Sequence, residues 1–241
     1  MIGGIVLERI KLFCLPYAGG SAMIYKSWKR YLDSRIDLRP VELAGRGLRF
    51  KEPLYSNAEE AVNDLCNNII EQLDEEPFAF FGHSMGTILT YELVQKVIAQ
   101  TKKVPLHVFF SGRYPPFVDV KNEKIHMLPD KEFLAELKHL GGMDNEVLEN
   151  KEILELFLPI LRSDYKLVDT YRHNGSIAKF NCDITVLNGN SDKYIEGKEV
   201  NRWRECTINN CWFYEFDDGH FFINKYKEEV AAVINKMLLN S

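Results

Sequence analysis

The sequence predicts an α/β fold with a mostly parallel central sheet and helices on both of its faces. Short apolar runs, rich in aromatic and β-branched residues and bounded by Gly, Pro or Asp, alternate with longer amphipathic stretches. Alternation of this kind is typical of βαβ units. Taken in chain order, the short runs expected to be strands are 11–17, 38–43, 78–82, 106–112, 184–189 and 212–216.

The amphipathic stretches predict the helices that cover the sheet. We expect them at roughly 22–33, 57–73, 85–100, 197–206 and 222–239. Ligands of such sheets bind at the carboxyl ends of the strands. Candidate functional residues should therefore lie in the loops that follow strands.

The alternation stops between about 115 and 178, where the chain is charged and mostly helical. One helix is predicted at 133–140, ending at Gly141 and Gly142, and a second at 147–165, interrupted or kinked near Pro159. An insertion at this place can cover the strand ends as a lid. With no repeat and no linker in the sequence, we expect one domain over 1–241 that carries this lid.

Composition excludes several classes of protein. The 241 residues are 46% hydrophobic, with a net charge of −5, which suits a globular domain and argues against a nucleic-acid binder. Five scattered cysteines without a C-x-x-C argue against a disulfide framework or a zinc site, and favour the reducing cytoplasm. We expect no signal peptide and no membrane-spanning segment.

The stretch F-G-H-S-M-G-T, which begins at Phe81, joins a predicted strand to a predicted helix. G-x-S-x-G at such a junction places a serine on a sharp turn, where small residues two positions before and after make room for it. Ser84 is therefore the candidate nucleophile and Met85 N–H the first candidate oxyanion donor. The alternative is a tight turn with an inert serine.

A serine nucleophile needs a base, and the base needs an acid to orient it. In this fold the partners follow in the order acid, then histidine. His220 comes just after the last predicted strand, and Asp192 follows the strand before it. These two are the candidate base and acid, whereas His83, next to the serine, is expected to pack or to support the site.

The second oxyanion donor should come from the loop after an early strand. The stretch L-P-Y-A-G-G-S-A, which begins at Leu15, fits, and Ala18 N–H is the candidate. The alternative is a helix-entry loop whose glycines serve only local geometry. Phosphate binding is set aside, since neither G-x-x-x-x-G-K-[ST] nor G-x-G-x-x-G occurs.

Six motifs together resemble the type II thioesterases, stand-alone α/β-hydrolases that accompany nonribosomal peptide and polyketide synthases. In chain order these are L-P-Y-A-G-G-S-A, V-E-L-A-G-R-G-L-R-F, F-F-G-H-S-M-G, L-R-S-D-Y, L-N-G-N-S-D and D-D-G-H-F-F. The family pattern often reads P-G-R where this chain has Ala44 before Gly45 and Arg46. The resemblance covers about residues 11 to 225.

This resemblance implies an activity: hydrolysis of acyl thioesters on the phosphopantetheine arms of acyl or peptidyl carrier proteins. It implies Ser84, Asp192 and His220 as the triad, with Ala18 and Met85 as oxyanion donors. The family also suggests a monomer. The triad mechanism needs no metal or organic cofactor, and together with the composition it leads us to expect a cytoplasmic protein that binds neither nucleic acid nor membrane.

The resemblance leaves other features of the chain open. Arg46 and Arg49 could contact phosphate or an acidic carrier, or be solvated surface residues. Apolar lid residues could line an acyl channel or pack the lid on the core, and lid lysines could dock a carrier or simply be solvated. The apolar residues are Phe133, Leu137, Met143, Leu154, Phe157 and Leu158, and the lysines are Lys121, Lys124, Lys131 and Lys138.

Three other functions remain compatible with the motifs. A small-molecule carboxylesterase or lipase would use the same triad on an oxygen ester. An acyltransferase would replace water with an alcohol or an amine. A non-catalytic binding module could keep the scaffold without the reaction.

Overall fold

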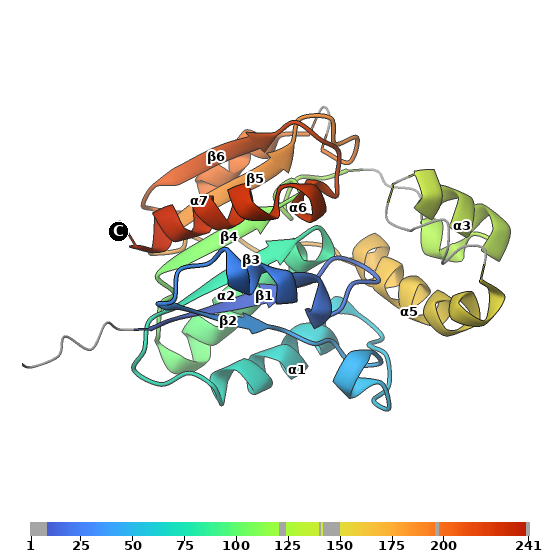
Figure 1. Ribbon diagram of the computed structural model, residues 1–241, viewed down its shortest axis with the longest axis horizontal. Helices are drawn as coiled ribbons and strands as arrows, with labels where there is room; N and C mark the ends of the chain where they lie inside the picture. The colour runs from blue at the N-terminus through green and yellow to red at the C-terminus, as the bar shows by residue number, and fades with distance from the viewer. Residues whose placement is uncertain (1–8, 121–123, 140, 142–149, 196–197, 240–241) are drawn as a thin grey trace, which may run out of the picture.

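A computed structural model describes residues 9–120, 124–139, 141, 150–195 and 198–239. Six strands form one sheet in the order β2-β1-β3-β4-β5-β6, and every neighbouring pair is parallel (Figure 1). They are β1 (Ile10–Leu15), β2 (Ile36–Pro40), β3 (Phe78–His83), β4 (His107–Ser111), β5 (Asp183–Gly189) and β6 (Cys211–Phe216). The predicted α/β class is confirmed, and each predicted strand is present with ends shifted by at most three residues.

The helices divide between the two faces of the sheet. In chain order they are the 3-10 helices η1 (Ala22–Arg30) and η2 (Gly47–Arg49), then α1 (Ala58–Ile70), α2 (Met85–Thr101), η3 (Ile125–Met127), α3 (Asp130–His139), α5 (Lys151–Thr170), η4 (Val200–Cys206), α6 (Phe222–Lys225) and α7 (Lys227–Leu239). Side chains of α1, α2 and η4 share one core cluster with Phe13 and Phe80. Those of η1, α6 and α7 share another with Leu12 and Phe81. Because successive strand residues point to opposite faces, one buried strand supplies both clusters.

Two of the predicted helices are 3-10 helices instead. In η1 the fully buried residues are Tyr25 and Trp28, and in η4 they are Trp203 and Cys206. Both pairs are three residues apart, which matches the three-residue turn of a 3-10 helix and explains why this form presents them to the sheet. The last predicted helix is divided at Tyr226 into α6 and α7.

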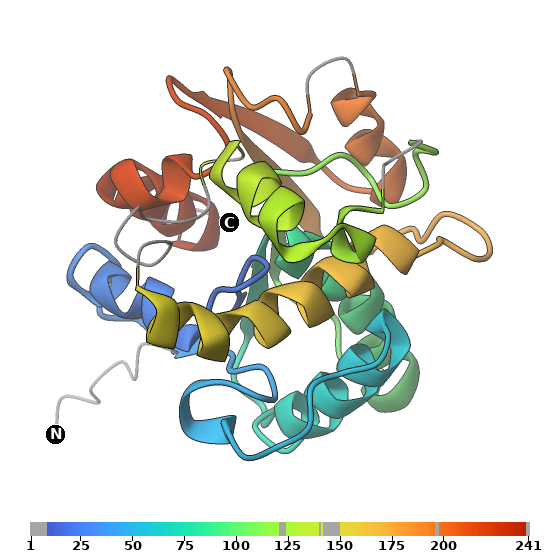
Figure 2. The ribbon, with the colours of Figure 1, turned by 90° about the vertical axis from the view of Figure 1, so that its right-hand side faces the viewer.

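The lid helices α3 and α5 lie beyond the carboxyl ends of the strands (Figures 1 and 2). They share a small apolar cluster of Phe133 and Leu137 from α3 with Leu161 from α5. Of the interruption or kink predicted near Pro159, the interruption is wrong, since α5 is continuous through this residue. Pro159 lies on the exposed side of α5, where water can bond the carbonyl that proline leaves unpaired. Of the predicted helix start, 147–149 lie outside the described residues.

Gly141 follows α3 with a φ of 75°, which fits the predicted helix stop, while Gly142 lies outside the described residues. Within the described ranges, no helix combines the length and apolar character needed to cross a membrane.

Candidate active site

Ser84 occupies a strained turn between β3 and α2. Its φ of 56° and ψ of −113° are rare for a residue with a side chain. A Cβ at Gly82 would strike the Gly86 carbonyl, and one at Gly86 would strike the backbone of Leu15 and Pro16. The G-x-S-x-G spacing is therefore required by close backbone approach on both sides of the serine, as the sequence predicts.

The structure brings Ser84, His220 and Asp192 together. His220 Nε2 lies 2.8 Å from Ser84 Oγ, and His220 Nδ1 lies 2.7 Å from Asp192 Oδ2. The histidine is 8% exposed and the aspartate 3%, so both bonds are shielded from water. Hydrogen bonds in such surroundings are stronger than in solvent. The arrangement can draw the proton from the serine hydroxyl and hold a charged imidazole.

The loops that carry the acid and the histidine lie against each other. Gly189, at the end of β5, has no room for a Cβ because the carbonyls of Asp218 and Gly219 lie there. Ser191 N–H donates to the Asp218 carbonyl at 3.0 Å. The second carboxylate oxygen of Asp192 accepts the Tyr194 N–H at 2.8 Å. The carboxylate is thus held on both of its oxygens before any substrate binds.

His83 packs against the catalytic histidine. It is fully buried, and its Nδ1 lies 2.8 Å from Ser111 Oγ. Burial lowers the pKa of His83 well below 6.5, so the ring is neutral. Its centroid lies 5.1 Å from that of His220. The expected packing role of His83 is confirmed, and the neutral ring adds no charge that would repel a protonated His220.

The two candidate oxyanion donors lie in neighbouring segments. Met85 opens α2, and the missing Cβ of Gly86 lets Leu15 and Pro16 run against the first turn of that helix. Ala18 follows in the same loop. Neither the Ala18 nor the Met85 N–H donates to a described residue. Both amides remain available to a negatively charged oxygen near the helix N-terminus, where the helix dipole favours it.

A buried ion pair holds the loop that contains Ala18. Arg46 Nη1 and Nη2 donate to the two carboxylate oxygens of Asp164 at 2.6 and 2.7 Å, and these side chains are 5% and 1% exposed. Asp164 also accepts the Gly19 N–H at 2.7 Å, while Arg46 donates to the Gly20 carbonyl at 3.0 Å. The lid helix α5 is therefore tied to the loop through its aspartate.

This ion pair corrects the expectations for the two arginines. Arg46 is neither solvated nor free for a phosphate, since Asp164 occupies its guanidinium. Arg49 pairs with Glu52 and with Asp64, the latter at 2.8 Å, so it is not free either. Asp164 was missed as a functional candidate, although L-R-S-D-Y stood out as a motif. The signal that could have found it is the combination of that motif with A-G-R, because a carboxylate is the usual partner of a buried arginine.

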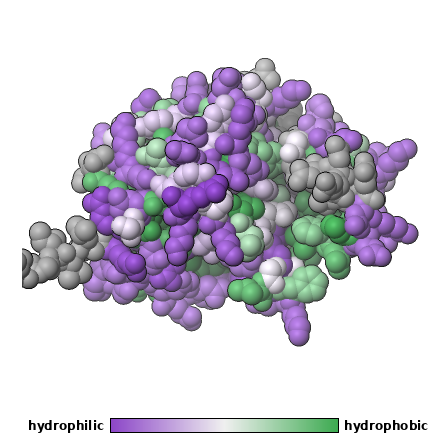
Figure 3. All heavy atoms as spheres, in the orientation of Figure 1, coloured by the Kyte–Doolittle hydropathy of each residue, from purple (hydrophilic) through white to green (hydrophobic). Residues whose placement is uncertain are grey.

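The apolar lid residues divide into two groups. Phe133 and Leu137 are 0% and 2% exposed and pack the lid together. Phe157, by contrast, is 41% exposed. Figure 3 shows apolar side chains gathered over this part of α5 and the η2 segment; there the exposed large residues are Leu48, Phe50, Ile153, Leu156 and Phe157. Packing therefore accounts for the first group only.

The exposure of the other lid residues named from the sequence does not distinguish between their alternative roles. Leu154 and Leu158 are half-buried, and Lys124, Lys131 and Lys138 are exposed. Met143 and Lys121 lie outside the described residues.

The parallel sheet, the serine turn and the order of the three side chains define a protein of the α/β-hydrolase class. The model of the thioesterase domain family matches residues 10–238, and the chain belongs to that family.

Known relatives agree with this assignment. A protein of Brevibacillus parabrevis named linear gramicidin dehydrogenase LgrE is 36% identical over 95% of this chain and 88% of its own. The crystal structure of ClbQ, from the colibactin NRPS/PKS pathway, has a TM-score of 0.92 at 35% identity, covering 96% of this chain and 98% of that one. BorB, a type II thioesterase from the borrelidin biosynthetic cluster, has a TM-score of 0.86 at 30% identity, covering 95% and 93%. The resemblance to type II thioesterases is confirmed.

Proposed function

We propose that this thioesterase hydrolyses acyl groups from the phosphopantetheine arms of carrier proteins in nonribosomal peptide or polyketide biosynthesis. The observation that carries the proposal is the 2.8 Å approach of His220 Nε2 to Ser84 Oγ, with Asp192 behind the ring at 2.7 Å. The relatives support the pathway, because ClbQ comes from the colibactin NRPS/PKS pathway and BorB from the borrelidin biosynthetic cluster.

The first half of the reaction transfers the acyl group to the enzyme. Ser84 Oγ attacks the thioester carbonyl while His220 Nε2 takes its proton, and Asp192 stabilises the imidazolium through Nδ1–H. The tetrahedral oxyanion accepts hydrogen bonds from the Ala18 and Met85 amides. The carbon–sulfur bond then breaks, the proton on Nε2 passes to the departing sulfur, and the carrier leaves with a free thiol.

The second half returns the enzyme to its starting state. Water takes the place of the thiol, loses its proton to His220 Nε2, and attacks the acyl-serine. The same two amides hold the second oxyanion. Collapse releases the carboxylic acid, and Nε2 returns the proton to Ser84 Oγ. No metal or organic cofactor enters this scheme.

The partners are acyl or peptidyl carrier proteins, and the enzyme acts as a cytoplasmic monomer. The triad by itself does not distinguish a thioester from an oxygen ester, so an esterase remains the second candidate. An acyltransferase would need a bound alcohol or amine in place of water at the second step.

The experiment is a panel of acyl-carrier proteins, followed by intact-protein mass spectrometry, with kcat/KM measured in parallel on a p-nitrophenyl ester. We expect release of the acyl group as free acid, with a clear preference for the carrier-bound thioester. A higher kcat/KM on the p-nitrophenyl ester would favour the esterase, and acyl groups recovered on an added alcohol or amine would favour the transferase.

Ser84→Ala serves as the control. If this variant and the wild type release acyl groups equally slowly, hydrolysis through an acyl-serine is excluded. Labelling of wild type, but not of Ser84→Ala, by a fluorophosphonate would exclude a non-catalytic module.

A further inference from the structure

A cavity of about 440 Å³ lies between the start of the lid insertion, the end of α5 and α2. Its walls are partly apolar, with Ile88, Phe117 and Val168 among them. Its polar members include Arg113, which is buried, and half-buried His173, whose two ring nitrogens are buried. A mixed lining with a few convergent polar groups is typical of a binding site for a small organic group.

Arg113 is a buried cation without a counter-charge among the described residues. The residue is 8% exposed, and its Nε is buried with no hydrogen-bond partner. In the part of the chain that the structure describes, no carboxylate lies within 4 Å of its guanidinium. Its one described partner is the Tyr114 ring, 4.9 Å from the guanidinium carbon. A cation–π contact offsets only part of the cost of burying a charge.

The position of Arg113 is fixed by its backbone. Gly112 N–H donates to the Leu187 carbonyl at 2.9 Å, and the Trp203 indole N–H donates to the Arg113 carbonyl at 2.9 Å. The guanidinium thus starts from a rigid point at the end of β4. Because this backbone is already fixed, less conformational entropy is lost when the side chain pairs with a ligand.

His173 adds two more unpaired atoms to the same cavity. Both of its ring nitrogens are buried without a hydrogen-bond partner among the described residues. The ring packs edge-on against Tyr91 and Phe117. Buried polar atoms are almost always bonded. Their gathering here indicates that the cavity receives a group with hydrogen-bonding oxygens.

The cavity adjoins the reactive serine. Ile88 follows Ser84 by four residues, which is one turn of α2 or about 6 Å along its axis. The positive charge of Arg113 also acts on the hydroxyls of Tyr165 and Tyr194, where it opposes the burial that raises their pKa. The Tyr194 ring lies 4.6 Å from that of His220. Ser84 N–H also donates to the Ser111 carbonyl at 2.8 Å, two residues before Arg113, so the far end of a short acyl chain on Ser84 lies within reach of this side chain.

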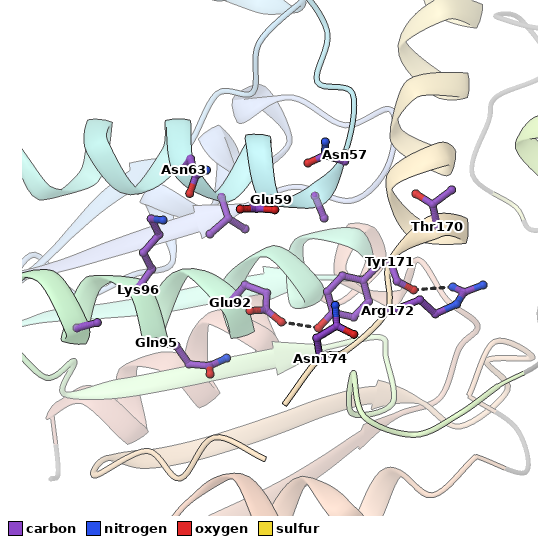
Figure 4. A pocket seen from close by; sticks show the side chains of 13 residues that line it. Asn57, Glu59, Asn63, Glu92, Gln95, Lys96, Thr170, Tyr171, Arg172 and Asn174 are labelled. Atoms are coloured by element: carbon purple, nitrogen blue, oxygen red, sulfur yellow. Dashed lines mark hydrogen bonds between the residues drawn. The ribbon is translucent and has the colours of Figure 1, made fainter. Parts of the chain in front are cut away.

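The carboxylates nearest the cavity do not compete for Arg113. Asp119, which also lines it, is exposed to solvent. Glu92 lies beyond Tyr171, in the neighbouring cavity drawn in Figure 4, where it accepts the Tyr171 hydroxyl at 2.5 Å. Arg172 shares the cavity, but it is exposed and donates to the backbone carbonyls of Asp169 and Tyr171.

We propose that this cavity is an acyl subsite that selects acyl groups ending in a carboxylate, with Arg113 as the residue that pairs with it. The proposal rests on the proposed thioesterase function and specifies its substrate class. The anionic oxygen could in principle come from the phosphate of a phosphopantetheine arm. The acyl carboxylate is favoured because Ile88, which lines the cavity, lies one turn of α2 from Ser84.

The test compares glutaryl and 5-oxohexanoyl thioesters of N-acetylcysteamine, which have the same length and differ in the terminal carboxylate. Neither carries a phosphate. For wild type we expect kcat/KM to be higher for glutaryl by about tenfold or more. Arg113→Met should reduce the glutaryl to 5-oxohexanoyl ratio by about ten- to a hundredfold, as expected for loss of a hydrogen bond between charged groups. Arg113→Lys should restore part of the ratio.

Lys96→Met is the matched control, since it removes the same charge from the neighbouring cavity of Figure 4 and should leave the ratio as in wild type. Equal loss on both substrates in Arg113→Met would mean that the arginine is only structural and would overturn the proposal. So would a wild-type ratio near one, or an Arg113 effect seen only with carrier-bound substrates, which would point to phosphate. Failure of Ser84-dependent release on every thioester would instead refute the proposed function.

Discussion

The ion pair between Arg46 and Asp164 leads to the prediction that one double variant recovers thermal stability without recovering catalytic rate. We consider Asp164→Leu, Arg46→Met and the double variant. Asp164 alone accepts three hydrogen bonds, two from Arg46 and one from the Gly19 N–H. The two bonds from Arg46 form the ion pair, whereas the bond from Gly19 N–H holds the loop that contains Ala18. Asp164→Leu removes both the ion pair and the bond to the loop. The double variant removes the unpaired charge of Arg46 as well, but it does not restore the bond to the loop.

The structure allows both effects to be estimated. Asp164→Leu leaves Arg46, itself 4% exposed, without a counter-charge, which costs about 3–5 kcal/mol. For a chain of this size that corresponds to a fall in Tm of roughly 6–20 °C. The double variant should recover most of it, since an apolar pair of similar volume is often as stable as a buried ion pair. Loss of an aligned oxyanion donor lowers kcat by roughly 10²–10³-fold, in the single and the double variant alike.

The assay combines calorimetric Tm with single-turnover release from an acyl-carrier protein. A matched control is the double variant Arg35→Met with Asp33→Leu, which removes a partly exposed pair of the same kind, with its two bonds at 2.9 and 3.2 Å. It should leave kcat unchanged and Tm within about 2 °C. If the Arg46 and Asp164 double variant recovers kcat together with Tm, the carboxylate does not position the loop and the reasoning fails.

Three further predictions follow from single side chains. Ser84→Ala and His220→Ala should each lower kcat by about 10⁴-fold or more with Tm changed little, measured by single-turnover kinetics. Gly86→Ala should lower both Tm and kcat, because its Cβ would meet rigid backbone carbonyls; unchanged values would contradict the steric account. Burial lowers the pKa of His107 from 6.5 to about 4, so stability is complete above pH 6.5 and falls by about 3 kcal/mol as pH drops to 4. Urea unfolding should show a flatter pH dependence for His107→Gln, which can keep the bond to Thr185.

The fold was predictable because its strands are short, apolar and separated by helices. Phe78–His83 reads as a buried strand from composition alone, and Ser84 marks where it must turn. The form of the helices was harder to predict. Whether 22–33 folds as an α-helix or a 3-10 helix depends on Tyr25 and Trp28 reaching the sheet together, which is a tertiary contact. The predicted interruption at Pro159 failed for a similar reason. The cost of a proline inside a helix depends on whether water can bond the backbone carbonyl that the proline leaves unpaired.

The reacting residues were also accessible from sequence, since chain order and strand ends select Ser84, Asp192 and His220. Residues that act through another element were not. The burial of Arg46 depends on a carboxylate 118 positions away, and nothing local distinguishes it from a solvated arginine. Arg113 follows a strand and a glycine, and only the cavity and the lack of a counter-charge single it out. Sequence patterns report local geometry, whereas desolvation of a charge is a property of the assembled fold.

One face of α5 contacts the loop of Ala18, the surroundings of His220 and the Arg113 cavity. Leu161, Asp164, Tyr165 and Val168 recur at spacings of three and four residues, which places them on the same side of the helix. Leu161 packs where a Gly19 side chain would be, and Asp164 binds Arg46 and the Gly19 amide. Tyr165 hydrogen-bonds to Tyr194, which packs against His220, and Val168 lines the Arg113 cavity. Two turns of the lid thus touch the oxyanion loop, the surroundings of the base and the acyl subsite. Lifting this half of α5 would break the buried ion pair between Asp164 and Arg46 and leave Arg46 buried without its partner, whereas Ile153, Leu156 and Phe157 in the other half are already exposed. We therefore predict that the C-terminal half of the lid helix stays in place when substrate binds, and that movement is confined to the other half and to α3.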